Sequence, residues 1–218
     1  MSKKIFLVII VVLLAFGIHF IFYSQDVAKG LEQNLIRLHV VANSDSYEDQ
    51  ALKMEIRDTI VKYMGERLKD SKNISESKQI VNINMDNIKS LINKEIKSYG
   101  KNYPVEINFG RYPFPTKSYG DITLPAGNYQ ALNVSIGKGA GSNWWCVLFP
   151  PLCFVDVTHG TVPESVREEL KNALSNEEYK IVTTSENDND IPVKIKFKIV
   201  EFFQSSRIKF SGIISKIF

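Results

Sequence analysis

The sequence lacks the short motifs that mark the common catalytic and nucleotide-binding sites. It has no P-loop, no GxGxxG dinucleotide turn, no HExxH metal motif and no GxSxG nucleophile turn. The run Gly137–Gly141 is rich in glycine, but no helix of the kind that binds a phosphate follows it. We therefore assign no catalytic residue, no cofactor and no small-molecule substrate from motifs.

The sequence also lacks a strong charge imbalance. Its 27 Lys and Arg residues face 24 Asp and Glu residues, which leaves a net charge of +3. This charge is too small to argue for a nucleic-acid partner. With 44% hydrophobic residues and no internal repeat, the 218 residues have the composition of a globular protein with one domain.

Cysteine is scarce, and its only two positions are Cys146 and Cys153. Pro150 and Pro151 lie between them and could turn the chain so that the two sulfur atoms meet. The sequence leaves two alternatives open, a disulfide closing a short loop or two buried free thiols. A metal site is not expected, because two cysteines without histidines at ligand spacing do not form a zinc site.

The N-terminus carries an apolar run, Ile5 to Phe22, directly after Lys3 and Lys4. Its length is just sufficient to cross a membrane, and the lysines orient the N-terminus toward the cytoplasm. No clear A-x-A cleavage site follows, which favours an uncleaved anchor over a cleaved signal peptide. We predict an anchor at 1–24, a stem at 25–34 and one extracytoplasmic domain at 35–218.

Apolar periodicity after residue 34 predicts a mixture of strands and helices. The expected strands are 35–42, 103–109 and 128–137, and the expected helices are 47–68, 80–99 and about 163–176. A long turn-rich connection at 110–127, with 122–124 as a short strand, joins the second and third strands, which we expect to pair antiparallel across it. The segment 185–190 is a polar loop, and 193–203 fits a strand or a helix. The pattern predicts an α+β fold in which two long helices cover one face of an antiparallel sheet.

The most unusual stretch is 137–156, GKGAGSNWWCVLFPPLCFVD. Its glycines and prolines argue against a helix, and its apolar side chains are too many to leave in water, so we expect an irregular buried plug. In extended backbone Trp144 and Trp145 point to opposite sides, so one ring can enter the core while the other faces outward. An outward tryptophan is a typical interface anchor, although packing of both rings is the plain alternative.

One catalytic alternative can be assembled from the residues. Cys146 with His159 or His39 would make an exported cysteine hydrolase acting on cell wall. Burial of Cys146 in its apolar run would raise the thiol pKa and make it inert, which argues against this reading.

Three segments resemble stage II sporulation protein R, a family of endospore-forming Firmicutes. They are RLHVVANSDSYEDQALKMEIRD (37–58), FPTKSYGDITLPAGNY (114–129) and GAGSNWWCVLFPPLCFVD (139–156). The resemblance implies an exported signalling protein, not an enzyme. Such a protein leaves the forespore for the space facing the mother cell and activates a membrane-embedded aspartic protease, which processes the pro-form of sigma-E.

The resemblance assigns no contact residue. From their chemistry alone, the candidates for binding a partner are Phe114, Lys117, Tyr119, Trp144 and Trp145.

Overall fold

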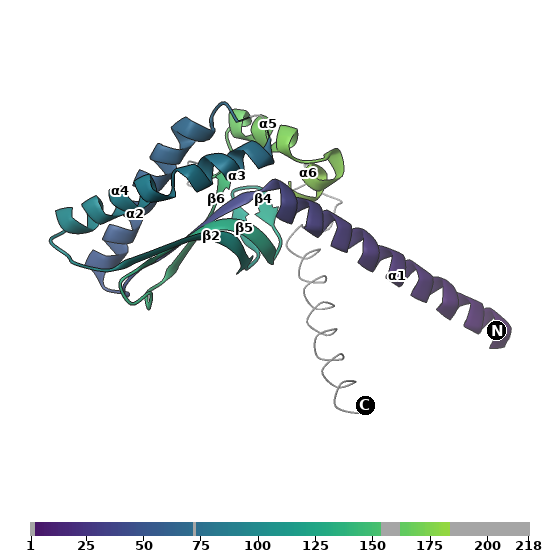
Figure 1. The fold of residues 1–218 in the computed structure, drawn as a ribbon. Coiled ribbons are helices and arrows are strands. Elements are labelled where there is room, and N and C mark those ends of the chain that lie inside the picture. Colours follow the sequence, from purple (N-terminus) through teal and green to yellow (C-terminus); the bar gives the residue numbers. More distant parts are fainter. Residues whose placement is uncertain (1–2, 72, 154–161, 184–218) are drawn as a thin grey trace.

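The computed structural model describes residues 3–71, 73–153 and 162–183 (Figure 1). The predicted features at His159, 185–190 and 193–203 lie outside these residues. The helices are α1 (Lys3–Asn34), α2 (Tyr47–Leu68), α3 (Ile74–Ile83), α4 (Met85–Ser98), α5 (Glu164–Ala173) and α6 (Asn176–Val182). The strands are β1 (Ile36–Val41), β2 (Val105–Phe114), β3 (Lys117–Tyr119), β4 (Ile122–Leu124), β5 (Gly127–Ile136) and β6 (Asn143–Phe149). The mixed α+β class is confirmed.

Four strands form the main sheet in the order β2-β5-β1-β6. The predicted antiparallel pairing of β2 with β5 is confirmed, and β6 pairs antiparallel with β1. The prediction of an antiparallel sheet is wrong for the central pair, because β1 and β5 run parallel. The chain leaves β1 for the helices α2–α4 and re-enters at β2. Its return strand β5 then inserts between β2 and β1, so β5 takes the direction of β1.

One face of the sheet packs against α2, α3 and α4 (Figure 1). The helix α2 has the predicted bounds, and the Ser46 side chain accepts the Asp49 backbone N–H at 3.3 Å as its N-cap. The predicted single helix at 80–99 is wrong, because Asn84 separates α3 from α4. The Asn84 amide donates to the Ile80 carbonyl oxygen and accepts from the Tyr63 hydroxyl, each at 2.8 Å. An asparagine held this way competes with the backbone for helical hydrogen bonds.

The opposite face is covered as well, which corrects the expectation that helices lie on one side only. The end of α1 and the helices α5 and α6 gather over one end of the sheet, together with the β3–β4 hairpin (Figure 1). The predicted turn-rich connection at 110–127 contains the end of β2 and this hairpin, and the short strand predicted at 122–124 is confirmed as β4. Arg167 of α5 pairs with Asp121 in the turn of the hairpin, and this ion pair joins α5 to the hairpin.

The segment 25–34, predicted as a stem, packs against the domain. It is the C-terminal part of α1, and Val27 and Leu31 are buried in the second core cluster. Glu32 accepts hydrogen bonds from Arg111 at 2.6 Å and from the Asn128 backbone at 2.8 Å. These contacts hold the end of α1 against β2 and β5.

The first turns of α1 expose the apolar side chains of 5–12 to solvent. Within the part of the chain that the structure describes, no helix combines the length and the hydropathy that a membrane crossing requires. The anchor and its orientation stay predictions.

Candidate functional site

The expectation of an irregular plug at 137–156 is wrong for its central part. Asn143–Phe149 is the edge strand β6, in register with β1 from Val41 to Ile36. Its aromatic and β-branched residues suit a pleated, half-buried strand. The preceding glycines serve the turn from β5, where Gly137 and Gly139 both have φ of +59°. The strand ends at the proline pair, which cannot continue the ladder.

The two adjacent tryptophans lie on opposite faces of the sheet, as their extended backbone predicts. Trp144 packs against the helical layer, where the Arg57 guanidinium lies 4.4 Å from its ring centroid. Trp145 points to the other face and stacks on the His39 ring, with centroids 3.7 Å apart and planes 3° apart. Both rings are partly buried, and each packs against the core cluster of its own face. A role for either ring in partner recognition stays a prediction.

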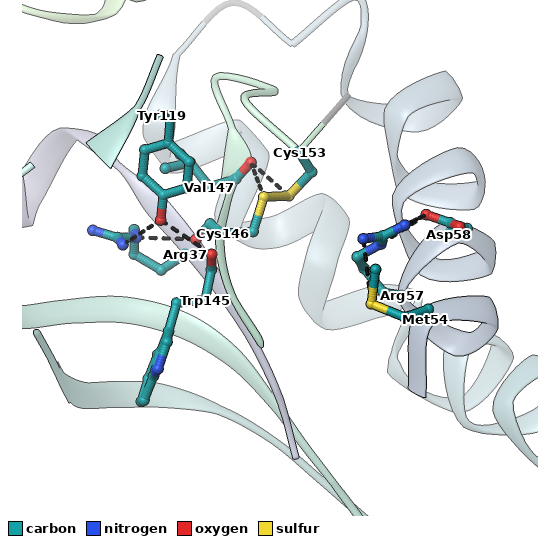
Figure 2. Close-up of a disulfide and its surroundings, with 9 residues drawn as sticks. All are labelled: Arg37, Met54, Arg57, Asp58, Tyr119, Trp145, Cys146, Val147 and Cys153. Atoms are coloured by element: carbon teal, nitrogen blue, oxygen red, sulfur yellow. Dashed lines mark hydrogen bonds and ion pairs between the residues drawn. A yellow bond between two sulfur atoms is a disulfide. The ribbon is translucent and has the colours of Figure 1, made fainter. Parts of the chain in front are cut away.

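Arg37 is the polar centre of the face that carries Trp145. It lies in β1 and is completely buried. Its Nε donates to the Cys146 carbonyl oxygen at 3.0 Å, and Nη2 donates to the Tyr119 hydroxyl at 2.8 Å. The Tyr119 hydroxyl donates in turn to the Trp145 carbonyl oxygen at 3.2 Å. Figure 2 shows this chain of hydrogen bonds, which fixes the β6 backbone between Trp145 and Cys146.

Aromatic rings surround the Arg37 charge. Its guanidinium carbon lies 4.6 Å from the Phe114 ring centroid and 4.9 Å from that of Tyr129. Within the described residues, Nη1 has no hydrogen-bond partner, so the ring faces supply the remaining stabilisation of the cation. Burial raises the pKa of Tyr119 and of Tyr129, while the adjacent Arg37 charge opposes that rise. Both phenols are therefore neutral and can donate hydrogen bonds.

The structure brings together three of the five candidates for partner binding. Phe114 contacts Trp145 edge-to-face at 4.8 Å, and Tyr119 reaches the Trp145 carbonyl. Phe114 and Tyr119 are buried, however, so they support Trp145 rather than present themselves to a partner. Lys117 is half-buried at the start of β3, and Trp144 lies on the other face.

The sequence did not single out Arg37, and it offered His39 either as the partner of Cys146 in the hydrolase alternative or as a structural histidine. The available signal was an arginine inside an otherwise apolar strand, LIRLHVVA. Burial lowers the pKa of His39, although its hydrogen bond with Asn143 at 2.8 Å partly opposes the shift. The imidazole is accordingly neutral near pH 7.

The structure joins Cys146 and Cys153 in a disulfide, with Cα atoms 5.5 Å apart. Both sulfur atoms lie close to the Val147 carbonyl oxygen, as Figure 2 shows. Cys146 packs in the cluster under the helices, whereas His39 stacks on Trp145 on the other face. The proposed Cys146–His39 nucleophile pair is therefore not formed, and His159 lies outside the described residues.

We expect the disulfide to stabilise the chain by about 2.5 kcal/mol, from the loop-closure entropy of a cross-link spanning so few residues. The test is urea unfolding of the full chain with and without reductant. Reduction should lower the midpoint of the wild type and leave the Cys146→Ala/Cys153→Ala double variant unchanged. Equal midpoints for the oxidised and reduced wild type would contradict the prediction.

A polar junction joins the start of α2 to the β5–β6 turn. The Asp49 carboxylate is buried and accepts from Asn43 at 2.8 Å and from Ser44 at 2.5 Å. Buried Lys53 donates to the Ser142 carbonyl oxygen at 3.0 Å. The first and third of the resembling segments thus meet here, away from Arg37.

This junction predicts a loss of stability in acid. Burial alone would raise the pKa of Asp49, but the hydrogen bonds from Ser44 and its neighbours together hold it below the ordinary value. Because the pKa of Asp49 is lower in the folded chain than in the unfolded chain, its ionisation stabilises the fold. This stabilisation is complete above the unfolded pKa, about 3.9, and is lost as the pH falls through the folded pKa. In the Asp49→Asn variant, the urea midpoint of the full chain should therefore depend less on pH below about pH 4 than it does in the wild type. Parallel curves for the variant and the wild type would contradict this.

Arg37, Phe114, Tyr119, Tyr129 and Trp145 form one group of side chains, the Arg37 cluster. The fold and this cluster define an α+β domain in which the segments 37–58, 114–129 and 139–156 meet around Arg37. The model of one family, stage II sporulation protein R, matches residues 32–159, and the chain belongs to this family. Stage II sporulation protein R of Bacillus subtilis (strain 168) is 38% identical over 160 residues, covering 73% of this chain and 70% of that protein. No solved structure matches the chain. Membership supports a role in sporulation, and the matched range contains the entire Arg37 cluster.

Proposed function

We propose that this protein is an exported sporulation signal. It leaves the forespore, stays at the membrane through its apolar N-terminal segment, and activates the membrane-bound aspartic protease that processes the pro-form of sigma-E. The observation that carries the proposal is the family match across residues 32–159. The apolar side chains that α1 exposes at 5–12 support membrane attachment.

Trp145 is the residue we assign to the contact with the protease. Its neighbours hold it rigidly, since His39 stacks on its ring and the Arg37–Tyr119 pair fixes its backbone. A preorganised aromatic side chain loses little entropy on binding, which is how a few residues come to dominate an interface.

The mechanism is a population shift of the protease. A ligand favours the active state only to the extent that it binds that state more tightly than the inactive one. A shift from 1% to 99% active requires a preference of about 10⁴-fold, or about 5.5 kcal/mol. Loss of one interface anchor, worth about 2 kcal/mol or more, should therefore remove much of the activation.

Reconstitution tests the proposal. The full chain, the protease and the sigma precursor are co-expressed in a non-sporulating host, and the shortened sigma factor is measured by immunoblot. Processing should require both the protease and this chain. Absence of processing, with the chain exported and folded, would overturn the proposed function.

Within this assay, Trp145→Ala should reduce processing at least tenfold at equal protein level. Tyr47→Ala is the matched control, because Tyr47 is an aromatic residue that is 88% exposed at the start of α2. Tyr47→Ala should process at the wild-type rate. If the sigma precursor is processed equally with the Trp145→Ala and Tyr47→Ala variants, Trp145 does not contribute to the contact with the protease.

A further inference from the structure

Three successive rows of side chains cross the sheet on the face that carries Trp145. The first row, Gly110–Ala131–Arg37–Val147, lies under the hairpin, and its members other than Gly110 are fully buried. The second row is Asn108–Asn133–His39–Trp145, and the third is Glu106–Ser135–Val41–Asn143. Each row takes one residue from each of the four strands.

Among the residues that the structure describes, the buried members of the apolar cluster on this face end at the first row, and Trp145 of the second row packs against them. In the second and third rows every side chain is half-buried or exposed. The alternation of the strands confirms which way these side chains point, because the intervening residues Leu132, Val134 and Val40 pack under the helices. The helices α1, α5 and α6 gather at the far end of the sheet (Figure 1). Within the described ranges 3–71, 73–153 and 162–183, these two rows form an open patch beside Trp145.

The open patch is polar but nearly uncharged. Three asparagines and a serine provide neutral donors and acceptors, His39 is neutral near pH 7, and Glu106 is the one carboxylate among its eight residues. Asn108 donates to Glu106 at 2.9 Å and Asn143 bonds His39, so part of this capacity is already oriented. Such a surface suits a ligand that offers amide groups rather than charges, with an apolar group over Trp145.

The size of the patch decides what kind of partner it fits. Four strands spaced about 4.8 Å apart, each with two residues on this face, cover about 260 Å². A stable dimer interface buries about 800 Å² on each partner. The patch is too small to hold a second copy of this chain by itself and matches one short polypeptide segment.

We infer that the open patch formed by Asn108, Asn133, His39 and Trp145 with the Glu106 row binds a short, uncharged segment of the partner protease's extracytoplasmic part. The inference rests on the proposed function and locates its contact surface. The segment hydrogen-bonds to the asparagine side chains and packs an apolar side chain against Trp145. A charged side chain placed in the middle of the patch excludes such a segment by bulk and by an unpaired charge.

The experiment introduces lysine at matched asparagines in the same co-expression assay. Asn133→Lys lies at the centre of the patch and Asn108→Lys on its outer strand, whereas Asn87→Lys lies on the exposed surface of α4, across the molecule. We expect at least a tenfold loss of processing for Asn133→Lys and Asn108→Lys, and no change for Asn87→Lys. Exported protein levels and near-UV circular dichroism identify a variant that fails to fold. If Asn133→Lys fails to fold, Asn108→Lys still tests the inference, because Asn108 is exposed and a lysine there does not disturb the core.

The outcomes separate the two claims. If the sigma precursor is not processed in the presence of the unmodified chain, the proposed function and this inference are both overturned. If the unmodified chain supports processing and Asn108→Lys supports it equally well, the inference alone is overturned. A photo-crosslinking residue at position 108 should capture the protease, and capture of a second copy of this chain, or of glycan, in its place also overturns the inference.

Discussion

Replacing Arg37 with alanine is expected to lower the free energy of unfolding by about 3 kcal/mol, one of the two largest effects of a single substitution that we predict. Arg37 is completely buried, and it donates to the Cys146 carbonyl oxygen and to the Tyr119 hydroxyl. Alanine would leave both acceptors without this donor and open a cavity among the rings. The measurement is urea unfolding of the full chain, followed by tryptophan fluorescence.

Arg57→Ala is the matched control for Arg37→Ala. The Arg57 guanidinium also lies over an aromatic ring, that of Trp144, but its side chain stays partly exposed and pairs with the exposed carboxylate of Asp58. Cation–π contacts at partly exposed sites contribute about 0.5–1 kcal/mol, so the loss should stay below about 1 kcal/mol. Equal losses for the two arginines would show that the buried hydrogen bonds of Arg37 contribute nothing.

A double-mutant cycle isolates the contact between Arg37 and Tyr119. Tyr119→Phe removes the hydroxyl that accepts from Arg37 and donates to Trp145. If the hydroxyl acts through Arg37, the Tyr119→Phe change costs less in the Arg37→Ala background than in the wild type, by about 1 kcal/mol. Additive losses would mean that the two side chains stabilise β6 independently.

The second large effect is expected at Gly141, in the turn between β5 and β6. A Cβ atom at this position would overlap the Ser44 carbonyl oxygen and lie 2.6 Å from its carbon and 2.9 Å from Ala42 Cβ. Two of these atoms are backbone, so Gly141→Ala must displace the turn and weaken the Gly141 N–H bond to the Ala42 carbonyl oxygen. We expect a loss of about 3 kcal/mol in the free energy of unfolding, at the upper end for overpacking.

Gly100→Ala provides the comparison for Gly141→Ala. Gly100 follows α4 with φ of +66°, but a Cβ atom there would meet nothing within 4 Å. Only the left-handed backbone opposes a side chain at this position, at a cost of about 1 kcal/mol. Urea midpoints of the two variants separate close packing from backbone conformation. A larger loss at Gly100 than at Gly141 would contradict the assignment of the junction as tightly packed.

Local patterns predicted the elements whose stability is local. The bounds of α2 follow from apolar residues at every fourth position and from the Ser46 cap. The pairing of β2 with β5 follows from two alternating segments joined through a connection rich in turns. By contrast, the break at Asn84 depends on Tyr63, which is 21 positions away and reaches it only after α2 and α3 have packed.

In the candidate site, too, some features follow from the local sequence and others depend on tertiary contacts. The opposite orientation of Trp144 and Trp145 follows from extended backbone, and the structure confirms it. The burial of Phe114 and Tyr119 could not be predicted, because it results from the β3–β4 hairpin folding over the sheet end. Arg37 was missed for the same reason, since its ring neighbours and acceptors come from β2, β3, β5 and β6.

The sequence by itself determined the α+β class, the helix α2, the alternation of β1, β2 and β5, and the family, because these depend on residue periodicity and on contiguous segments. Only the tertiary structure decided the strand order, the parallel central pair, the strand nature of 143–149 and the open patch beside Trp145. The physical reason is that strand pairing joins backbone groups of distant segments. Which segments meet depends on the free energy of the whole core, and a periodic pattern records only which face each residue buries.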